Sequence, residues 1–217
     1  MRLARINHQG KPTLAVSEGN YLKLVIDSDL PTDPFAVLID PLLRKKAEAA
    51  AVKSTEKLNQ DQAKFMLPME HPGRILCVGL NYADHAAESP YEKPDYPIYF
   101  IRVDTGLIAH GESIIKPLVS EQLDFEGEIA AVIGKGGRAI SMDHALDHVI
   151  AYSIFNDGSL RDYQFKGPQW TLGKNFDKTG PFGPWLVPAD LLPPGIKGLN
   201  LQTRLNGQVV QDANTND

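Results

Sequence analysis

Apolar residues in the first part of the chain form three runs of strand length, which residues typical of turns separate. The runs are residues 2–6, 13–16 and 21–26. Gly-Lys-Pro at residues 10–12 lies in the first gap, and Glu-Gly-Asn at residues 18–20 lies in the second. Because glycine and proline favour tight turns between strands, this pattern predicts a small antiparallel sheet.

A helix is predicted to follow this sheet. Residues 32–34 (Thr-Asp-Pro) supply a capping side chain and a proline that suits the first helical position. Apolar residues then recur at helical spacing up to Leu43, whereas residues 44–66 show little apolar periodicity and form a solvated helix or a linker. We therefore predict a small N-terminal β/α domain over residues 1–70.

From residue 71 onward the pattern is dominated by strands. Four apolar runs have strand length: residues 74–79, 97–102, 123–134 and 149–155. A short helix is predicted at residues 141–148, and a hairpin is predicted around the Asn-Gly turn at 206–207, between residues 199–205 and 208–212. The chain is therefore α+β and β-rich, with a second domain over residues 71–217.

Composition and charge exclude several classes of protein. With 42% hydrophobic residues and 22 basic against 27 acidic residues, the chain is not disordered and has no basic surface for nucleic acid. No apolar run approaches the about 20 residues of a membrane helix, and residues 1–11 lack the apolar stretch of a secretory signal. The single cysteine, Cys77, excludes an intrachain disulfide and a thiolate metal cage. We expect a cytoplasmic protein without nucleic-acid or membrane partners.

Two acidic residues, Glu126 and Glu128, stand two positions apart in the predicted strand 123–134. Residues i and i+2 of a strand share one face, so the two carboxylates would lie side by side among apolar neighbours. A hard divalent cation such as Mg²⁺ or Ca²⁺ takes oxygen ligands and relieves their repulsion. A solvated strand face is the alternative, because Glu-x-Glu alone is a weak site marker.

Asp157 follows the buried run 149–155, in a position where site residues commonly stand on a rigid support. The alternative is a turn or a helix cap. If residues 159–165 are helical, Arg161 and Gln164 lie close to Asp157 on one face. The arginine could then pair with a carboxylate and the glutamine could reach a ligand, although a purely structural ion pair is the alternative for Arg161.

Two further features can carry chemistry. His85 and Glu88 are three residues apart, so on one helical turn the carboxylate orients the imidazole as a general base. Two exposed polar residues at a helix end would show the same spacing. Lys174 stands between apolar residues, and it either binds an anionic substrate or extends from the edge of the core to solvent.

Five segments, in this order and spacing, resemble the fumarylacetoacetate hydrolase family. They are VGLNYADHAAE (78–88), LDFEGEIAAVIGKGGRAI (123–140), FNDGSLRDYQ (155–164), QWTLGKNFD (169–177) and LNGQVVQDANTND (205–217). The resemblance covers residues 72–217, and the order of five segments makes it more specific than any single motif.

The resemblance implies a fold, a site and a cofactor. The fold would be a mixed, strongly curved β-sheet roll, and the family's members are usually homodimers. Glu126, Glu128 and Asp157 fall on the three carboxylate ligands of Mg²⁺, for which Ca²⁺ or Mn²⁺ can substitute. His85 and Glu88 fall on the pair that activates water, and Lys174 falls on a lysine near the substrate. Arg161 and Gln164 fall on residues that line the site.

The chain departs from the family in two places. Arg-Val at residues 102–103 stands where many members have Lys-Pro, which changes how the distal end of a substrate would be held. The family also continues past Asp217 with closing strands and a Thr-Gly-Thr-Pro loop that contacts substrate. We therefore expect that this chain is incomplete and that its site is open.

The activity that the resemblance implies is hydrolysis of a C–C bond in a β-diketo acid, a small-molecule keto acid such as an acylpyruvate, fumarylpyruvate or fumarylacetoacetate. His85 and Glu88 would activate water, and the cation would stabilise the departing enolate. One alternative is a 2-keto acid decarboxylase or isomerase, which passes through the same enolate. A second alternative is a non-catalytic, metal-stabilised domain. The enzymatic readings require the three carboxylates to converge.

Overall fold

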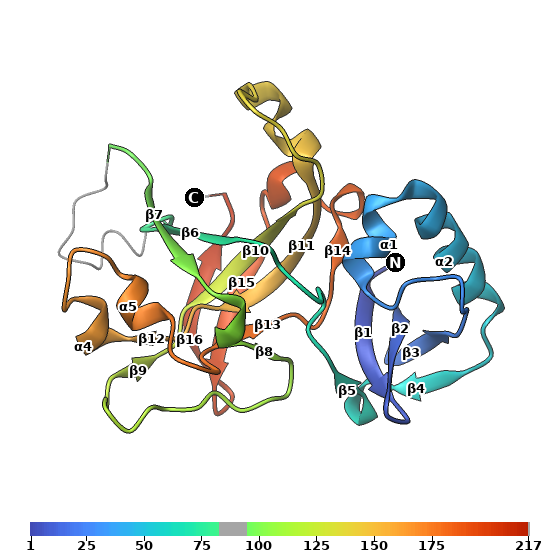
Figure 1. Cartoon of the computed structure of the whole chain (residues 1–217), viewed down its shortest axis with the longest axis horizontal. Helices are drawn as coiled ribbons and strands as arrows, with labels where there is room; N and C mark the ends of the chain where they lie inside the picture. Colours follow the sequence, from blue (N-terminus) through green and yellow to red (C-terminus); the bar gives the residue numbers. More distant parts are fainter. Residues whose placement is uncertain (83–94, 217) are drawn as a thin grey trace.

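The computed structural model describes residues 1–82 and 95–216, and Figure 1 shows a small sheet with two helices beside a larger, curled arrangement of strands. The N-terminal elements are β1 (Leu3–His8), β2 (Lys11–Glu18), β3 (Tyr21–Val25), α1 (Pro34–Ile39), α2 (Pro41–Lys53), β4 (Lys57–Asn59), η1 (Gln60–Gln62) and β5 (Lys64–Phe65). Five strands form one antiparallel sheet in the order β4-β3-β2-β1-β5. The three predicted strands form its centre, whereas β4 and β5 arise from the segment that was predicted to be a helix or a linker.

The helix predicted to run up to Leu43 is two helices, and this part of the prediction was wrong. Asp33 caps α1 by accepting a hydrogen bond from a backbone N–H of the first turn at 2.8 Å. Asp40 then leaves helical geometry and caps α2 in the same way. Pro41 follows with no N–H for a helical hydrogen bond, so a new helix begins there. No helix in the described part of the chain is long and apolar enough to cross a membrane.

The remaining elements form a larger mixed sheet and three two-stranded ladders. They are β6 (Ile75–Gly79), β7 (Ile98–Arg102), η2 (Asp104–Gly106), β8 (Leu107–Ala109), β9 (Leu123–Asp124), β10 (Gly127–Ile133), η3 (Met142–His148), β11 (Val149–Asn156), β12 (Ser159–Leu160), α4 (Arg161–Gln164), α5 (Thr171–Lys174), β13 (Gly180–Phe182), β14 (Val187–Pro188), η4 (Ala189–Leu191), η5 (Pro194–Ile196), β15 (Asn200–Leu205) and β16 (Gln208–Asn214). The sheet has the order β10-β11-β13-β8 with β14 beside β11, and its β13–β8 pair is parallel while the others are antiparallel. The ladders are β6–β7, β9–β12 and β15–β16. This curled, mixed arrangement confirms the predicted fold class (Figure 1).

The strand predicted over residues 123–134 is interrupted after its first two residues. The backbone N–H of Glu126 donates to the side-chain oxygen of Asn156 at 3.0 Å instead of to a neighbouring strand, and this separates β9 from β10. The backbone N–H of Asp157 donates in turn to the carbonyl of Glu126 at 2.8 Å. These two bonds hold the start of β10 against the end of β11, so the acidic residues of both segments come together.

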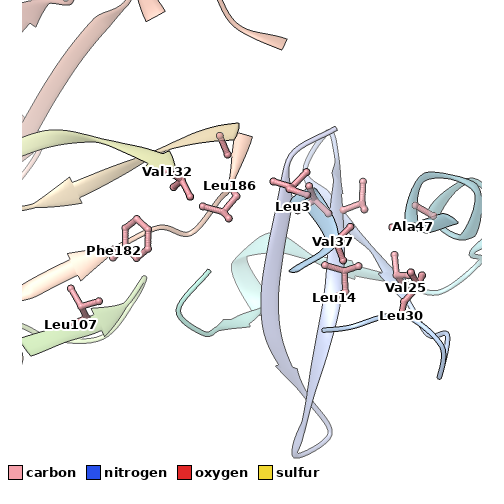
Figure 2. Close-up of a cluster of buried hydrophobic side chains, with 14 residues drawn as sticks. Leu3, Leu14, Val25, Leu30, Val37, Ala47, Leu107, Val132, Phe182 and Leu186 are labelled. Carbon is pink, nitrogen blue, oxygen red and sulfur yellow. The ribbon is translucent and has the colours of Figure 1, made fainter. Parts of the chain in front are cut away.

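The hydrophobic core is continuous between the small sheet and the larger one (Figure 2). Leu3, Leu14 and other side chains of the N-terminal elements pack in one cluster with Val132 and Phe182 of the larger sheet. The backbones meet as well, because Leu3 and Leu186 exchange two hydrogen bonds of 3.0 and 2.8 Å. The two parts therefore share buried side chains, and a domain boundary near residue 70 stays a prediction.

Candidate active site

A cavity of about 970 Å³ lies along β6 and β10 and includes the acidic start of β10. Apolar side chains of both strands line it, together with Phe100, Trp170 and Phe182 from neighbouring elements. Six of the residues predicted for the site line this one cavity: Glu126, Glu128, Asp157, Arg161, Gln164 and Lys174. The other two, His85 and Glu88, lie outside the described residues.

Lys174 is the last residue of α5, and its ammonium group lies between two of the carboxylates. The side chain is 2% exposed, and Nζ donates to Glu126 Oε2 at 2.7 Å and to Asp157 Oδ2 at 2.8 Å. Nζ also lies 5.0 Å from the centre of the Phe100 ring, which attracts a cation through its π electrons. Lys174 therefore does not extend to solvent. It joins two acidic residues that are distant in the sequence.

The helices α4 and α5 hold these groups because they approach each other very closely. A Cβ at Gly173 would lie 2.4 Å from the backbone nitrogen of Gln164, so this contact requires glycine. Gln164 is buried, and its side-chain oxygen accepts a hydrogen bond from Arg161 Nη1 at 3.0 Å. The helix that carries both residues is a single turn, because the two residues before it pair with β9 as β12.

Arg161 holds Glu126 from the side opposite Lys174. Its Nη1 donates to Glu126 Oε1, and its Nε donates to Asp124 Oδ2 at 2.9 Å. Burial lowers the pKa of Arg161, but the two carboxylates raise it more, so the pKa is above its ordinary value. Arg161 thus makes the structural ion pairs that the sequence left open as an alternative, and its side chain still lines the cavity.

Asp157 is buried, and both of its carboxylate oxygens are paired. Arg102 Nη1 donates to Oδ1 at 2.5 Å, while Lys174 Nζ donates to Oδ2. Arg102 is a departure from the family pattern, and this contact with Asp157 was not predicted from the sequence. A signal was present, because Arg102 follows Phe100 at i+2 in a strand and therefore shares its buried face, and a buried arginine needs a charged partner.

Glu128 differs from the other two acids of the cavity, because no hydrogen bond or ion pair joins its side chain to any of the described residues. Its pKa is raised to about 8, first by burial and then by the charges of Glu126 and Asp157, which outweigh the effect of Lys174. Burial and the charge of Glu128 also raise the pKa of Tyr82 to about 12. An ionised Glu128 would therefore lack a compensating cation among the described residues.

Charges of opposite sign alternate across the rest of the site. From β9 to β7 the order of contacts is Asp124, Arg161, Glu126, Lys174, Asp157 and Arg102. Three cations balance three anions in this series, and Glu128, which keeps its proton up to about pH 8, has no ion-pair partner among the described residues. Ion pairs of this kind contribute little net stability, but they fix the orientation of the groups that they join. Glu126 and Asp157 are therefore held in place before any ligand binds.

The carboxylates fit a hard divalent cation in donor type and in charge. Oxygen is the ligand atom that Mg²⁺, Ca²⁺ and Mn²⁺ prefer, and three carboxylates gather at one end of the cavity. Within residues 1–82 and 95–216, no three acidic, histidine or cysteine side chains stand in a ready-made cation site. At this cavity, Lys174 lies between Glu126 and Asp157 and pairs with both. A cation would bind beside the lysine, where Glu128 would release its proton to become a ligand.

Sequence comparisons relate the chain to known proteins. The family profile described as fumarylacetoacetate (FAA) hydrolase C-terminal matches residues 74–217. A mitochondrial oxaloacetate tautomerase of Xenopus laevis is 37% identical over 172 residues, which are 78% of this chain and 54% of the relative. The chain spans between 54% and 60% of the length of the first four curated relatives that it matches.

Solved structures share the fold. A fumarylacetoacetate hydrolase from the psychrophilic Exiguobacterium antarcticum has a TM-score of 0.81 at 28% identity, over 99% of this chain and 75% of that one. A maleylpyruvate hydrolase from Sphingobium sp. SYK-6, in complex with manganese(II) and pyruvate, has a TM-score of 0.81 at 23% identity, over 100% and 78% of the two chains, which shows the fold alone. These named relatives are enzymes. Because the family profile matches two thirds of the chain, the protein belongs to the fumarylacetoacetate hydrolase family.

Proposed function

We propose that this protein is a divalent-metal-dependent enzyme that converts a small 2-oxo acid through its enolate. The observation that carries the proposal is that Glu126, Glu128 and Asp157 line one cavity, in which Glu126 and Asp157 share the buried ammonium of Lys174. Acidic side chains that share a largely apolar cavity are typical of sites that bind a cation or move a proton.

Glu126, Glu128 and Asp157 would hold the cation, with Mg²⁺ as our first choice and Ca²⁺ or Mn²⁺ as substitutes. When bound, the cation would act as a Lewis acid that polarises the 2-oxo group of the substrate. The Sphingobium maleylpyruvate hydrolase was solved with manganese(II) and pyruvate, which supports a divalent cation and a 2-oxo acid as classes of ligand without favouring Mg²⁺.

Residues around the carboxylates would bind and orient the substrate. Lys174 Nζ, fixed in the wall of the cavity, would place a positive charge near the oxygen on which negative charge develops. Gln164 already uses its side-chain oxygen to accept a hydrogen bond from Arg161, so its amide nitrogen is the group that would donate to the substrate. Arg161 would orient Glu126 and, with its edge toward the cavity, bind the substrate carboxylate.

Hydrolysis of a C–C bond in an acylpyruvate is the first candidate reaction. His85, oriented by Glu88, would take a proton from water as the water oxygen attacks the distal carbonyl carbon. The C–C bond would then break, and its electron pair would pass to the methylene carbon of the 2-oxo acid, which takes up a proton. The products are a carboxylic acid and a shorter 2-oxo acid such as pyruvate.

Keto–enol tautomerisation of a 2-oxo acid such as oxaloacetate is the second candidate, and the curated relative from Xenopus laevis favours it. The reaction moves one proton between carbon 3 and the oxygen of carbon 2. It needs no attack by water, so it can proceed without the water-activating pair. The groups that stabilise the enolate would be the same in both reactions.

The test follows a panel of acylpyruvates and, separately, the enol form of oxaloacetate, with Mg²⁺ or with EDTA. We expect turnover of at least one substrate that requires the cation and is lost in Asp157→Asn. Release of pyruvate and a carboxylic acid from an acylpyruvate identifies hydrolysis. Decay of the oxaloacetate enol to the keto form, without release of pyruvate, identifies tautomerisation. His85→Ala should abolish the first reaction and leave much of the second. Turnover that survives EDTA, or no turnover of any substrate, would overturn the proposal.

The homodimer that the family resemblance implies is also a proposal. Leu76 pairs with Ile101, and Val78 pairs with Tyr99, on one face of the β6–β7 ladder. These four side chains are between 41% and 64% exposed, and an apolar face of this kind is typical of a surface that a second subunit covers. Light scattering after gel filtration should give twice the monomer mass, and Leu76→Glu should reduce it to the monomer mass if this face is the contact.

A further inference from the structure

We propose that Arg102 is a positioning residue. It would fix the carboxylate of Asp157 in the orientation in which Asp157 ligates the divalent cation, and it would not touch the substrate. This inference rests on the proposed metal site. It gives a role to a residue that stands where many family members have lysine.

Arg102 is enclosed by the protein and makes its contacts in one fixed arrangement. The side chain is 0% exposed. Its Nη1 donates to Asp157 Oδ1 at 2.5 Å and to the carbonyl of Gly158 at 3.1 Å, and its Nη2 donates to Thr179 Oγ1 at 3.0 Å. The planar guanidinium thus reaches the carboxylate, the backbone that follows it and a buried hydroxyl at the same time.

The backbone on both sides of Arg102 is held as well. The N–H of Val103 donates to Asn175 Oδ1 at 2.7 Å, and Asn175 Nδ2 donates to the carbonyl of Ile101 at 2.9 Å. A Cβ at Gly180 would lie 2.9 Å from Arg102 Nη2, so the guanidinium has little room to move in that direction. Both the backbone at Arg102 and its guanidinium group are therefore held in place.

The two cations on Asp157 lie in different surroundings. Lys174 lines the cavity and divides its ammonium between two carboxylates. Arg102 does not belong to the lining of the cavity, and it holds the other oxygen of Asp157 from within the protein. Among the described residues, Arg102 is the one side chain that binds Oδ1 of Asp157. Without it, the carboxylate could turn about its χ2 angle and leave the orientation that faces the cavity.

Positioning and simple electrostatics predict opposite results for the loss of Arg102. By Coulomb's law alone, removal of a positive charge beside Asp157 strengthens the binding of a divalent cation. If Arg102 acts by orienting the carboxylate, its removal weakens binding instead. Partners that orient metal ligands commonly contribute roughly 10- to 100-fold in metal affinity. The sign of the change therefore identifies the role of Arg102.

The experiment titrates Mn²⁺ into the purified full chain and measures free Mn²⁺ by electron paramagnetic resonance. We expect roughly 10- to 100-fold weaker binding in Arg102→Gln, and an intermediate affinity in Arg102→Lys, which keeps the charge but loses the planar fork. Asp157→Asn identifies the site itself. Arg5→Gln is a matched control, because Arg5 is also a buried arginine whose Nε lacks a hydrogen-bond partner in the described part of the chain. It pairs with Glu70 at 2.8 Å, and neither residue lines the cavity or contacts a predicted cation ligand, so its loss should leave Mn²⁺ affinity unchanged.

Each outcome either supports or contradicts the positioning role of Arg102. Wild-type affinity or tighter binding in Arg102→Gln, together with loss of binding in Asp157→Asn, overturns the role of Arg102 and leaves the metal site intact. Absence of Mn²⁺ binding by the wild-type chain overturns the proposed function and this inference together. If Arg102→Gln does not fold, Thr179→Val replaces it, since it removes one hydrogen bond of Arg102 at nearly constant volume. Weaker Mn²⁺ binding in Thr179→Val supports the inference, and unchanged binding contradicts it.

Discussion

Replacement of Glu128 by glutamine should make the protein more stable at alkaline pH in the presence of a chelator. Glu128 is the acid of the cavity that has no ion-pair partner within the described residues, and its pKa is raised from 4.5 to about 8 by burial and by Glu126 and Asp157. Glutamine has nearly the same shape and cannot ionise. The substitution therefore removes a buried negative charge and leaves the packing of β10 in place.

The magnitude follows from the difference in proton binding between the folded and unfolded states. Between pH 4.5 and about 8, folded Glu128 keeps a proton that the unfolded chain has released. Stability that depends on this proton is present below pH 4.5, falls as the pH rises, and is fully lost above about pH 8. Each pH unit corresponds to about 1.4 kcal/mol, and part of the carboxyl is accessible to water, so we expect a difference of about 3 to 5 kcal/mol above pH 8.

Urea unfolding of both proteins in EDTA, at intervals from pH 4.5 to pH 9, measures this difference. The free energies of unfolding should agree at the acidic end, and Glu128→Gln should become progressively more stable toward the alkaline end. Saturating Mg²⁺ should reduce the difference, because a cation bound by the carboxylates replaces the proton in the wild-type protein. Parallel pH profiles for the two proteins would refute the reasoning, since they would mean that Glu128 ionises as an ordinary carboxyl.

Three further predictions test the surroundings of the site. Lys174→Met removes the cation that buried Asp157 shares with partly buried Glu126, and it should cost about 3 to 5 kcal/mol in urea unfolding at pH 7. Wild-type stability of the variant would contradict the ion pairs. Burial raises the pKa of Cys77 to about 12, so at pH 8 about one thiol in 10⁴ is ionised. Ellman's reagent should therefore react slowly with the native protein and quickly once guanidinium has unfolded the chain. Fast reaction of the native protein would contradict this prediction. Gly79→Ala would place a Cβ 2.1 Å from Trp170 Cζ3 and should cost about 1 to 3 kcal/mol with a change in tryptophan fluorescence. The control Gly136→Ala meets no atom within 4 Å and should change neither quantity.

Several elements could be predicted from the sequence because short-range contacts decide them. The strands β1 to β3 follow from three apolar runs of strand length and two turns, and the β15–β16 hairpin follows from the Asn-Gly turn at 206–207. Asp33 caps α1 as expected, since a cap needs only the N–H groups of the next few residues.

Other predictions failed where a distant partner competes with the local pattern. The run 123–134 has the composition of one strand, but the N–H of Glu126 bonds to Asn156, 30 residues away, and the strand is interrupted. The strands β4 and β5 have little apolar periodicity, and they form because β3 and β1 offer free edges. In both cases hydrogen-bond partners that are remote in the sequence determine the backbone.

For the candidate site, the sequence by itself determined which acidic and basic residues are available. Through the family resemblance, it also indicated which of them lie together in one site. Only the tertiary structure decided that Lys174 is buried between two carboxylates, that Arg102 pairs with Asp157 across 55 residues of sequence, and that Glu128 lacks a compensating charge in the described part of the chain. The physical reason is that burial and ion pairing depend on which segments pack together. Residue identity fixes a charge, whereas its partner and its contact with water are set by the packed chain.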